Sequence, residues 1–443
     1  MGAAGALDPT GKASAGQYLG DVRFSTEDWL DNWELMAHAS YLQADFQATQ
    51  LQLFPNNATL PVDALGNINP SSKTLLAFPN GANTNLGRVE TIPSIELSSI
   101  YKGLNNHLLR FSSAFRYEDI VTNQSSNFGY GVPLPTVATG APFPSVVNGG
   151  LTNVTATPYA YLPSTHRSIW SLVAQDEWQI VTDWHLTAGV RYDNYSDFGG
   201  TFNPRAALVW DINKQLTSKI LYGKAFRAPN FSEQFTQNNP VVLGNSHLKP
   251  ETINTYEWSL NYRPVSSLST AVNVYYYEIN SLIALVADPI KQVNEYQNSG
   301  NQKGYGSEFE FDWQWSEQWN VKGNYAWQHA INESRNNVVT GVPAHHVYAA
   351  LVWKFLPQWQ LQPQINWIGG RTGATSDGVY QQLNGYETVD FTLRGKKLFG
   401  HLNLAASLRN AFDIKYYEPS ALQLPSTLPM PGRSFYLEAS VNF

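Results

Sequence analysis

The sequence predicts an all-β protein, a transmembrane antiparallel up-and-down β-barrel of about 16–17 strands. Three observations favour this fold. Many short segments alternate apolar and polar side chains, short and long connections alternate between them, and Trp and Tyr residues gather at both ends of the segments. Neighbouring residues of a strand point to opposite faces, so this alternation is expected where one face meets lipid and the other a wet lumen.

Composition narrows the class of protein. The chain has 443 residues, a net charge of −7, no Cys and 14% charged residues, against about a quarter in soluble domains. No segment reaches the roughly 18 apolar residues of a membrane helix, and the acidic balance argues against nucleic acid as a partner. The first residues (MGAAGALDPT) do not form a signal peptide. We therefore expect either a mature exported chain or one truncated at its amino end.

The alternating segments define the expected strands. Residues 1–32 are expected to be partly irregular, a remnant of an upstream barrel strand, and residues 33–443 to form the barrel. The expected strands are residues 21–24, 33–41, 95–101, 109–117, 170–180, 186–195, 206–210, 220–226, 256–262, 268–276, 309–315, 319–327, 347–355, 359–367, 389–393, 402–408 and 435–443.

The connections between these segments alternate in length. Most pairs of strands are joined by a few residues, whereas the pairs themselves are separated by long polar stretches. The long stretches are residues 47–90, 119–165, 228–252, 280–304, 329–345, 369–385 and 413–433. In outer-membrane barrels the short turns face the periplasm and the long loops face outside.

Aromatic residues are expected to form a girdle at each membrane interface, where amphipathic rings prefer to lie. Trp184, Trp319 and Trp353 flank short turns, while Tyr195 and Trp367 lie at loop ends. Two residues break the alternation. Asp176 falls on an apolar face near a short turn, and Pro363 lies inside a strand, where we expect a local bulge.

The last strand ends the chain on an aromatic residue. One of its faces is apolar to the end, which suits a strand in contact with lipid. We expect this strand to close the barrel and to carry the signal that the barrel-assembly machinery reads. The residues in question are Phe435, Leu437, Val441 and Phe443.

Three motifs resemble those of a known family. They are residues 221–231 (LYGKAFRAPNF), 245–252 (NSHLKPET) and 408–413 (LRNAFD). In this order and spacing they resemble the carboxy-terminal barrel of TonB-dependent outer-membrane receptors, and the resemblance covers nearly all the chain from Trp33 on. It implies uptake of a bulky nutrient, most often a ferric siderophore, across the outer membrane of a Gram-negative bacterium. The extracellular loops would hold the ligand, and no cofactor is expected.

The chain also departs from that family's pattern. Family barrels have twenty-two strands around a plug, and the plug carries the segment that contacts the TonB complex. The plug, the coupling segment and about five or six strands have no counterpart here. The chain is therefore interpreted as the carboxy-terminal part of a receptor. Contact with the TonB complex is expected only if a plug is supplied upstream.

No catalytic or metal-binding constellation stands out, so we do not expect an enzyme. His345 and His346 are adjacent, and on a strand they would point to opposite faces. Binding usually resides in loops, although a loop aromatic can equally pack its own loop. The candidate ligand-binding residues are Phe128, Tyr130, Tyr159, Tyr161, Phe235, Tyr296, Arg371 and Tyr380.

Two other functions stay open. A barrel of this size without a plug can leave a water channel, so the chain could act as a passive pore or be a non-functional receptor fragment. A soluble β-rich binding protein would instead bury its Trp and Tyr rings between two stacked sheets and fold without detergent.

Overall fold

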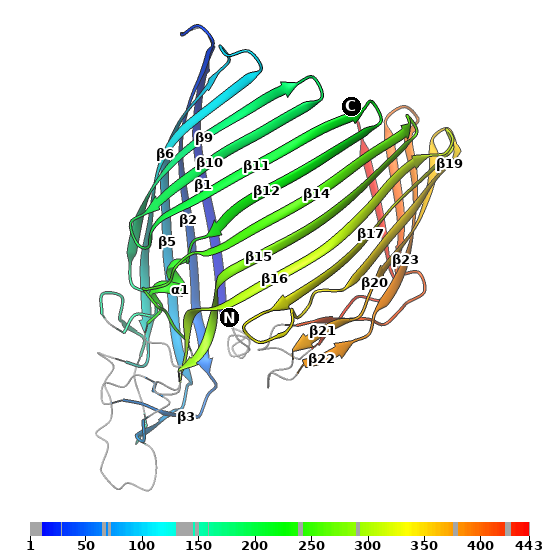
Figure 1. Cartoon of the computed structure of the whole chain (residues 1–443). Coiled ribbons are helices and arrows are strands. Elements are labelled where there is room, and N and C mark those ends of the chain that lie inside the picture. The colour runs from blue at the N-terminus through cyan, green and yellow to red at the C-terminus, as the bar shows by residue number, and fades with distance from the viewer. Residues whose placement is uncertain are drawn as a thin grey trace.

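Nearly the whole chain folds into one curved antiparallel sheet (Figure 1). The computed structural model describes residues 11–27, 29–63, 68–69, 72–129, 145–146, 150–157, 159–237, 242–288, 293–374, 380–420 and 427–442. Of the twenty strands in the main sheet, three are two-residue segments: β8 (Thr152–Asn153), β13 (Val242–Leu243) and β18 (Asn337–Val338). No helix in these ranges is long and apolar enough to cross a membrane.

The other seventeen strands of the sheet are long and confirm the expected number. They are β1 (Lys12–Thr26), β2 (Trp33–Phe54), β5 (Ala82–Tyr101), β6 (His107–Ser126), β9 (Thr165–Val181), β10 (Trp184–Tyr195), β11 (Gly199–Asn213), β12 (Leu216–Arg227), β14 (Glu251–Val265), β15 (Leu268–Asp288), β16 (Val293–Gln314), β17 (Trp319–Asn332), β19 (His345–Leu356), β20 (Trp359–Ile368), β23 (Tyr386–Leu398), β24 (Leu402–Arg409) and β27 (Ser434–Val441).

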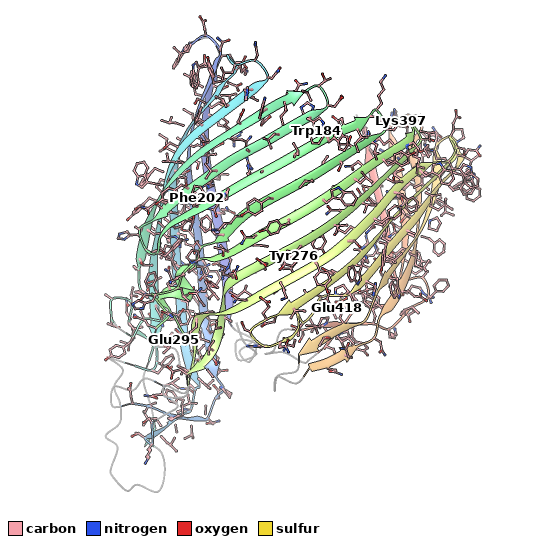
Figure 2. All side chains as sticks on the ribbon, viewed as in Figure 1. Trp184, Phe202, Tyr276, Glu295, Lys397 and Glu418 are labelled. Carbon is pink, nitrogen blue, oxygen red and sulfur yellow. The ribbon has the colours of Figure 1, made fainter. Side chains whose placement is uncertain are left out.

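The remaining elements lie in the long connections. One helix, α1 (Phe231–Phe235), follows β12, and small sheets form from β3 (Ala58–Pro61), β4 (Leu75–Phe78) and β7 (Ser145–Val146), from β21 (Arg371–Ala374) and β22 (Tyr380–Leu383), and from β25 (Tyr417–Pro419) and β26 (Thr427–Pro429). Figure 2 shows that the short turns and the long loops lie at opposite ends. Trp184 and Lys397 mark the turn end, and Glu295 and Glu418 mark the loop end.

The two outermost long strands of the sheet are β1 and β27. The first pairs with β2 along all fifteen of its residues, so the short strand expected at 21–24 is only part of it. The last pairs with β24, and within the described ranges no ladder joins it to β1. The odd number of long strands explains this. In an up-and-down sheet, strands one and seventeen run in the same direction, so β27 cannot close the cylinder by an antiparallel ladder with β1.

The expected alternation is confirmed by the registers. Phe435, Leu437 and Ala439 of β27 lie opposite the apolar residues Leu408, Ala406 and Leu404 of β24. Trp319 and Trp353 are also paired, and their rings stack 5.1 Å apart at 3°. Phe202, on the lipid-facing side of β11, is 58% exposed (Figure 2). The prediction that Tyr195 belongs to the girdle is wrong. It is 7% exposed and shares the parity of Arg191 and Asp193, so it faces the interior.

Several strands extend well past the loop-end girdle. Residues 280–304, expected as a loop, are mostly strand, because β15 runs to Asp288 and β16 begins at Val293. The same holds for the ends of the stretches at 47–90 and 119–165, where β2, β5 and β6 continue. Above the membrane both faces of a strand meet water. The two-residue apolar pattern therefore fades there, although the backbone ladder continues.

The two exceptions to the alternation are accommodated differently. Pro363 causes no bulge, because it stays in register with Phe391. The β19–β20 ladder omits two consecutive pairs, those of Pro363 and Gln362, since proline has no N–H to donate. Asp176, on the lipid-facing parity, binds His107 of the neighbouring strand, with 2.8 Å between Oδ2 and Nδ1. The imidazole stacks on Trp178 with the ring centroids 5.3 Å apart. This pairing lowers the cost of an acidic side chain near the interface.

Candidate functional site

The inner wall at the loop end carries a buried arginine, Arg167 of β9, which is 8% exposed. Its Nε donates to Glu118 Oε2 at 2.6 Å, and its Nη1 donates to the carbonyl oxygen of Pro229 at 2.8 Å and lies 3.4 Å from Asp197 Oδ2. Both carboxylates are nearly buried, with side chains 12% and 11% exposed. A buried ion pair requires good geometry and extra hydrogen bonds to offset desolvation, and this arginine has both.

Aromatic rings complete the surroundings of Arg167. Its guanidinium carbon lies 4.8 Å from the ring centre of Phe231 and 5.4 Å from that of Tyr195. Cations are attracted to the faces of such rings. Phe231 begins α1 and Tyr195 ends β10, so one side chain ties four separate parts of the chain together. We call Arg167 with its partners Glu118, Asp197, Pro229 and Phe231 the mouth hub.

Helix α1 is fixed by its own sequence as well. Asn230 caps it by accepting the N–H of Glu233 at 2.8 Å, and the Glu233 carboxylate accepts the N–H of Asn230 at 2.9 Å. This reciprocal capping box satisfies two backbone donors that a helix start leaves free. The helix therefore begins where the chain leaves the hub.

A second arginine clamps both ends of the loop that contains α1. Arg227, the last residue of β12, binds Glu233 of α1 at 2.9 Å and Glu251, the first residue of β14, at 2.7 Å. Burial opposes ionisation of Glu251. The hydrogen bonds from Arg227 and from the Ile283 N–H outweigh burial and hold the pKa of that carboxyl below its usual value. The two sequence motifs at 221–231 and 245–252 thus meet in one ion-pair cluster.

A cavity of about 380 Å³ opens beside the mouth hub. Helix α1 borders it on one side and the strands β5, β6 and β9 on the other. Its charged lining residues are Arg88, Glu90, Glu118, Asp119 and Arg167. This arrangement provides charged groups of both signs together with the ring of Phe231, which suits reversible binding of a polar ligand with flat apolar parts.

Three of the predicted ligand residues gather near α1. Phe235 ends the helix, and the carbonyl oxygen of Tyr161 accepts the N–H of Gln237 at 2.9 Å. Burial raises the pKa of Tyr296, and the nearby Tyr161 and Glu233 raise it further. Sequence reasoning chose these residues only as loop aromatics, with no signal that the fold brings them together.

The other predicted ligand residues are scattered. Phe128 is 5% exposed and packs in an apolar core with Leu76 and Phe78 of the stretch at 47–90, so it holds two loops together. The N–H of Tyr159 donates to Thr157 Oγ1 at 3.2 Å. Tyr130 and the side chain of Tyr380 lie outside the described residues.

Buried polar atoms near α1 were not foreseen. Gln234 is 3% exposed and Thr236 is 4% exposed. Within the described part of the chain, neither the amide nitrogen and oxygen of Gln234 nor the hydroxyl of Thr236 has a hydrogen-bond partner. Buried polar groups are normally paired, so these atoms are candidates for contact with a ligand.

Arg371 ties two other loops together on another part of the mouth. It is 4% exposed, forms an ion pair with Glu418, donates to the carbonyl oxygen of Tyr417 at 3.2 Å and lies 5.3 Å from the ring centre of Tyr386. The hydroxyl of Tyr386 donates to Glu418 at 2.8 Å. Burial and this hydrogen bond raise the pKa of Tyr386. Arg371 is therefore engaged in loop packing.

Replacing Arg371 with methionine is expected to loosen the loop at 410–433. Loss of charged hydrogen bonds costs about 1.5–3 kcal/mol, which makes local opening roughly tenfold or more frequent. The rate of proteolytic cutting in this loop measures the change. Lys415→Met is the control, because that side chain is 72% exposed and pairs with Asp413 in the same loop. Equal cutting rates in the two variants would contradict the role of Arg371.

No metal-binding cluster is found in the parts of the chain that the structure covers: no three or more His, Cys, Asp or Glu residues come together. The two adjacent histidines diverge. Nδ1 of His345 lies 2.8 Å from the hydroxyl of Tyr325, and Nε2 of His346 lies 2.7 Å from Oδ1 of Asn366. The strand points them to opposite faces, so they cannot chelate one ion together.

Comparison with known proteins agrees with the fold and with the motifs. The family model described as "TonB dependent receptor-like, beta-barrel" matches residues 4–411. The chain belongs to this TonB-dependent receptor family. Family membership and the barrel fold indicate the outer membrane of a Gram-negative bacterium.

Curated receptors are similar over part of their length. The iron-regulated outer membrane virulence protein of Vibrio cholerae is 27% identical over 302 residues, covering 62% of this chain and 44% of that protein. The metal-pseudopaline receptor CntO of Pseudomonas aeruginosa is 25% identical over 269 residues, covering 56% of this chain and 37% of that protein. The chain thus matches less than half the length of these relatives.

Solved receptor structures share the fold over almost the whole chain. The copper transporter OprC has a TM-score of 0.70 at 14% identity, covering 96% of this chain and 65% of its own. A ferric enterobactin receptor of Pseudomonas aeruginosa in complex with enterobactin has a TM-score of 0.66 at 16% identity, covering 97% of this chain and 63% of the receptor. At these identities the likeness shows the fold of the TonB-dependent receptor barrel.

Proposed function

We propose that this chain forms the barrel wall of an outer-membrane receptor that imports a metal chelate of siderophore size. The observation that carries the proposal is the mouth hub, in which Arg167 anchors α1 beside a cavity with charged and aromatic walls. A loop anchored at the mouth of a barrel is well placed to meet an incoming ligand. The names of two relatives, a metal-pseudopaline receptor and a ferric enterobactin receptor, support a metal chelate as the ligand class.

We further propose that Tyr161, Phe235 and Tyr296 supply aromatic contacts to this ligand, and that the buried amide of Gln234 supplies a hydrogen bond. Rings and a few well-placed polar groups are the usual lining of such sites. The Gln234 amide supports this assignment, because a bound ligand would relieve its missing hydrogen bonds.

Transport is proposed to need a plug. In the family it is the plug that contacts the TonB complex, so contact with that complex belongs to a form in which a plug is supplied. That the chain is a truncated form is part of this proposal and rests on the resemblance. The same proposal includes the division into residues 1–32, as a remnant of an upstream strand, and residues 33–443, as the barrel.

Uptake by whole cells tests the proposed function. A strain without its own siderophore receptors would express either the 443-residue chain or the same chain joined to an upstream plug. We expect radioactive iron to accumulate from one member of a panel of ferric siderophores in the plug-bearing strain, and only while TonB is present. Phe235→Ala and Tyr296→Ala should raise the half-saturating concentration. A folded plug-bearing form that imports none of the panel would overturn the proposal.

A passive pore is the second candidate. The inner face carries mixed charges, including the pair Arg191–Asp193 at 2.6 Å and the hydrogen-bonded pair Arg205–Gln175, and such a lining suits a water-filled lumen. Steady conductance of the chain alone in planar bilayers would favour this candidate. Failure to insert would favour a non-functional fragment.

Assembly is proposed to depend on the last strand. The lipid-facing row Phe435, Leu437 and Val441, together with Phe443, is the proposed signal for the barrel-assembly machinery. The first three are exposed on the outer face of β27, whereas Phe443 lies outside the described residues. Outer-membrane lipid is the proposed solvent of this face.

A further inference from the structure

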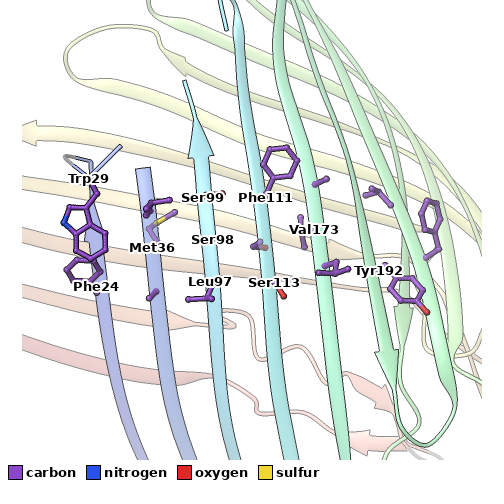
Figure 3. A pocket seen from close by; sticks show the side chains of 17 residues that line it. Phe24, Trp29, Met36, Leu97, Ser98, Ser99, Phe111, Ser113, Val173 and Tyr192 are labelled. Atoms are coloured by element: carbon purple, nitrogen blue, oxygen red, sulfur yellow. The ribbon is translucent and has the colours of Figure 1, made fainter. Parts of the chain in front are cut away.

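The outer wall near the turn end carries an apolar groove of about 740 Å³ (Figure 3). It crosses β2, β5, β6 and β9 on the lipid-facing side. Along these strands each small outward side chain lies opposite a large one of a neighbouring strand, which leaves a hollow between apolar ridges. The small residues are Ala37, Ser99, Ser113 and Ala174, and the facing large residues are Leu97, Phe111 and Leu172.

The groove suits a hydrocarbon chain. The backbone beneath it is already paired in ladders on both sides, so it offers no main-chain donors to an added peptide strand. Its walls are mostly carbon, and no charged side chain lines it. The groove also continues the lipid-facing surface without interruption, and lipid acyl chains are what that surface meets in a membrane.

One acidic group lies at the turn-side border of the groove. Asp176 follows Ala174 by two residues and therefore faces the same side of β9. One of its oxygens, Oδ2, binds His107, but the other, Oδ1, is buried and has no hydrogen-bond partner among the residues described. A buried carboxylate oxygen without a donor is costly. The side chain as a whole is 32% exposed, so the ammonium group of a lipid headgroup can approach this carboxylate.

We propose that the groove and Asp176 together form a site for one glycerophospholipid with an ammonium-bearing headgroup. The acyl chain lies in the groove, and the ammonium donates to the carboxylate of Asp176 at the level of the His107–Trp178 stack. The lipid comes from the leaflet on the short-turn side. This proposal depends on the barrel facing a membrane and is independent of the imported nutrient.

Native mass spectrometry of the full chain in detergent micelles tests this site. The probes are phosphatidylethanolamine and phosphatidylglycerol with identical acyl chains. We expect the folded chain to retain one phosphatidylethanolamine, with roughly a tenfold preference over phosphatidylglycerol, as loss of a hydrogen bond to a charged group predicts. Ser113→Phe should fill the groove and abolish retention of either lipid. Asp176→Asn should keep retention but lose the preference.

Ala349→Phe is the matched control, because it places the same ring on the lipid-facing side of β19, away from the groove. Heat-modifiable gel mobility reports folding of each variant. Should Ser113→Phe not fold, Ser99→Phe fills the same groove from the neighbouring strand. Lipid retention by a folded, groove-filled variant equal to that of Ala349→Phe would overturn the proposal. So would equal retention of the two lipids by the unchanged chain, or a dimer that groove filling dissociates.

Discussion

Replacing Arg167 with methionine is expected to release α1 and the loop at 228–250 from the inner wall. The change would leave Asp197 nearly buried without its cation, and Glu118 with only Arg116, at 2.9 Å. Removing one partner of a buried ion pair costs about 3–5 kcal/mol. Because the loop can open and let water reach these carboxylates, the first sign should be rapid cutting of the loop by protease. The denaturant midpoint, followed by Trp fluorescence in micelles, should fall as well.

Two variants separate this role from a general effect of losing an arginine. Arg23→Met makes the same change at a side chain that is 75% exposed and paired with Asp21 at 3.4 Å, so it should alter neither readout. Arg167→Lys keeps the charge but lacks the planar fork of donors, and its values should fall between those of the wild type and Arg167→Met. If Arg167→Met resists protease as well as Arg23→Met does, the hub does not hold the loop.

Lysine at Ile365 is expected to destabilise the barrel in a bilayer by about 2–4 kcal/mol, the cost of a charge on the lipid face near the midplane. Ile365 lies opposite Ala349, which lies opposite Gly323, midway between the girdle residues Trp319 and Trp327. Its neighbour Gln364 points to the interior, where its amide donates to Asp390 at 3.0 Å. The two adjacent positions therefore face opposite solvents.

Gln364→Lys is the matched control for Ile365→Lys. It introduces the same charge one residue away, next to Asp390, and should be nearly neutral. Urea unfolding in phosphatidylcholine vesicles measures both variants, and in detergent the difference should shrink because micelles deform more easily. Equal losses of stability for the two variants would mean that the assignment of faces on β20 is wrong.

Much of the wall could be predicted from the sequence because a membrane imposes opposite solvents on neighbouring residues. Strands such as β14 and β17 carry this pattern from one girdle to the other, and the structure confirms their pairing. Two kinds of feature could not be predicted this way. Strand ends beyond the membrane carry no alternation, so the hairpin of β15 and β16 was expected as a loop. A proline in the sequence does not predict whether the strand forms a bulge or the ladder only lacks a hydrogen bond, as it does at Pro363.

The candidate site was the least predictable part. The mouth hub joins residues 118, 167, 197 and 229, which lie on different strands and loops, and no local pattern marks them as partners. Arg227 and Glu251 stood inside motifs, but only their resemblance to a family drew attention to them. The last strand also shows a limit of local reasoning. Its apolar face was evident, whereas the parity that prevents it from pairing antiparallel with β1 follows only from counting the long strands that the structure describes.

Alternation along each strand also separates two kinds of selection. A substitution at an outward position is selected for its compatibility with the bilayer. A substitution at the next position is selected for its compatibility with the contents of the lumen. The cargo chemistry of such a wall can therefore drift over generations without disturbing insertion. In a saturation mutagenesis scan of β20 or β23, we expect positions that tolerate a charged residue to alternate with positions that do not.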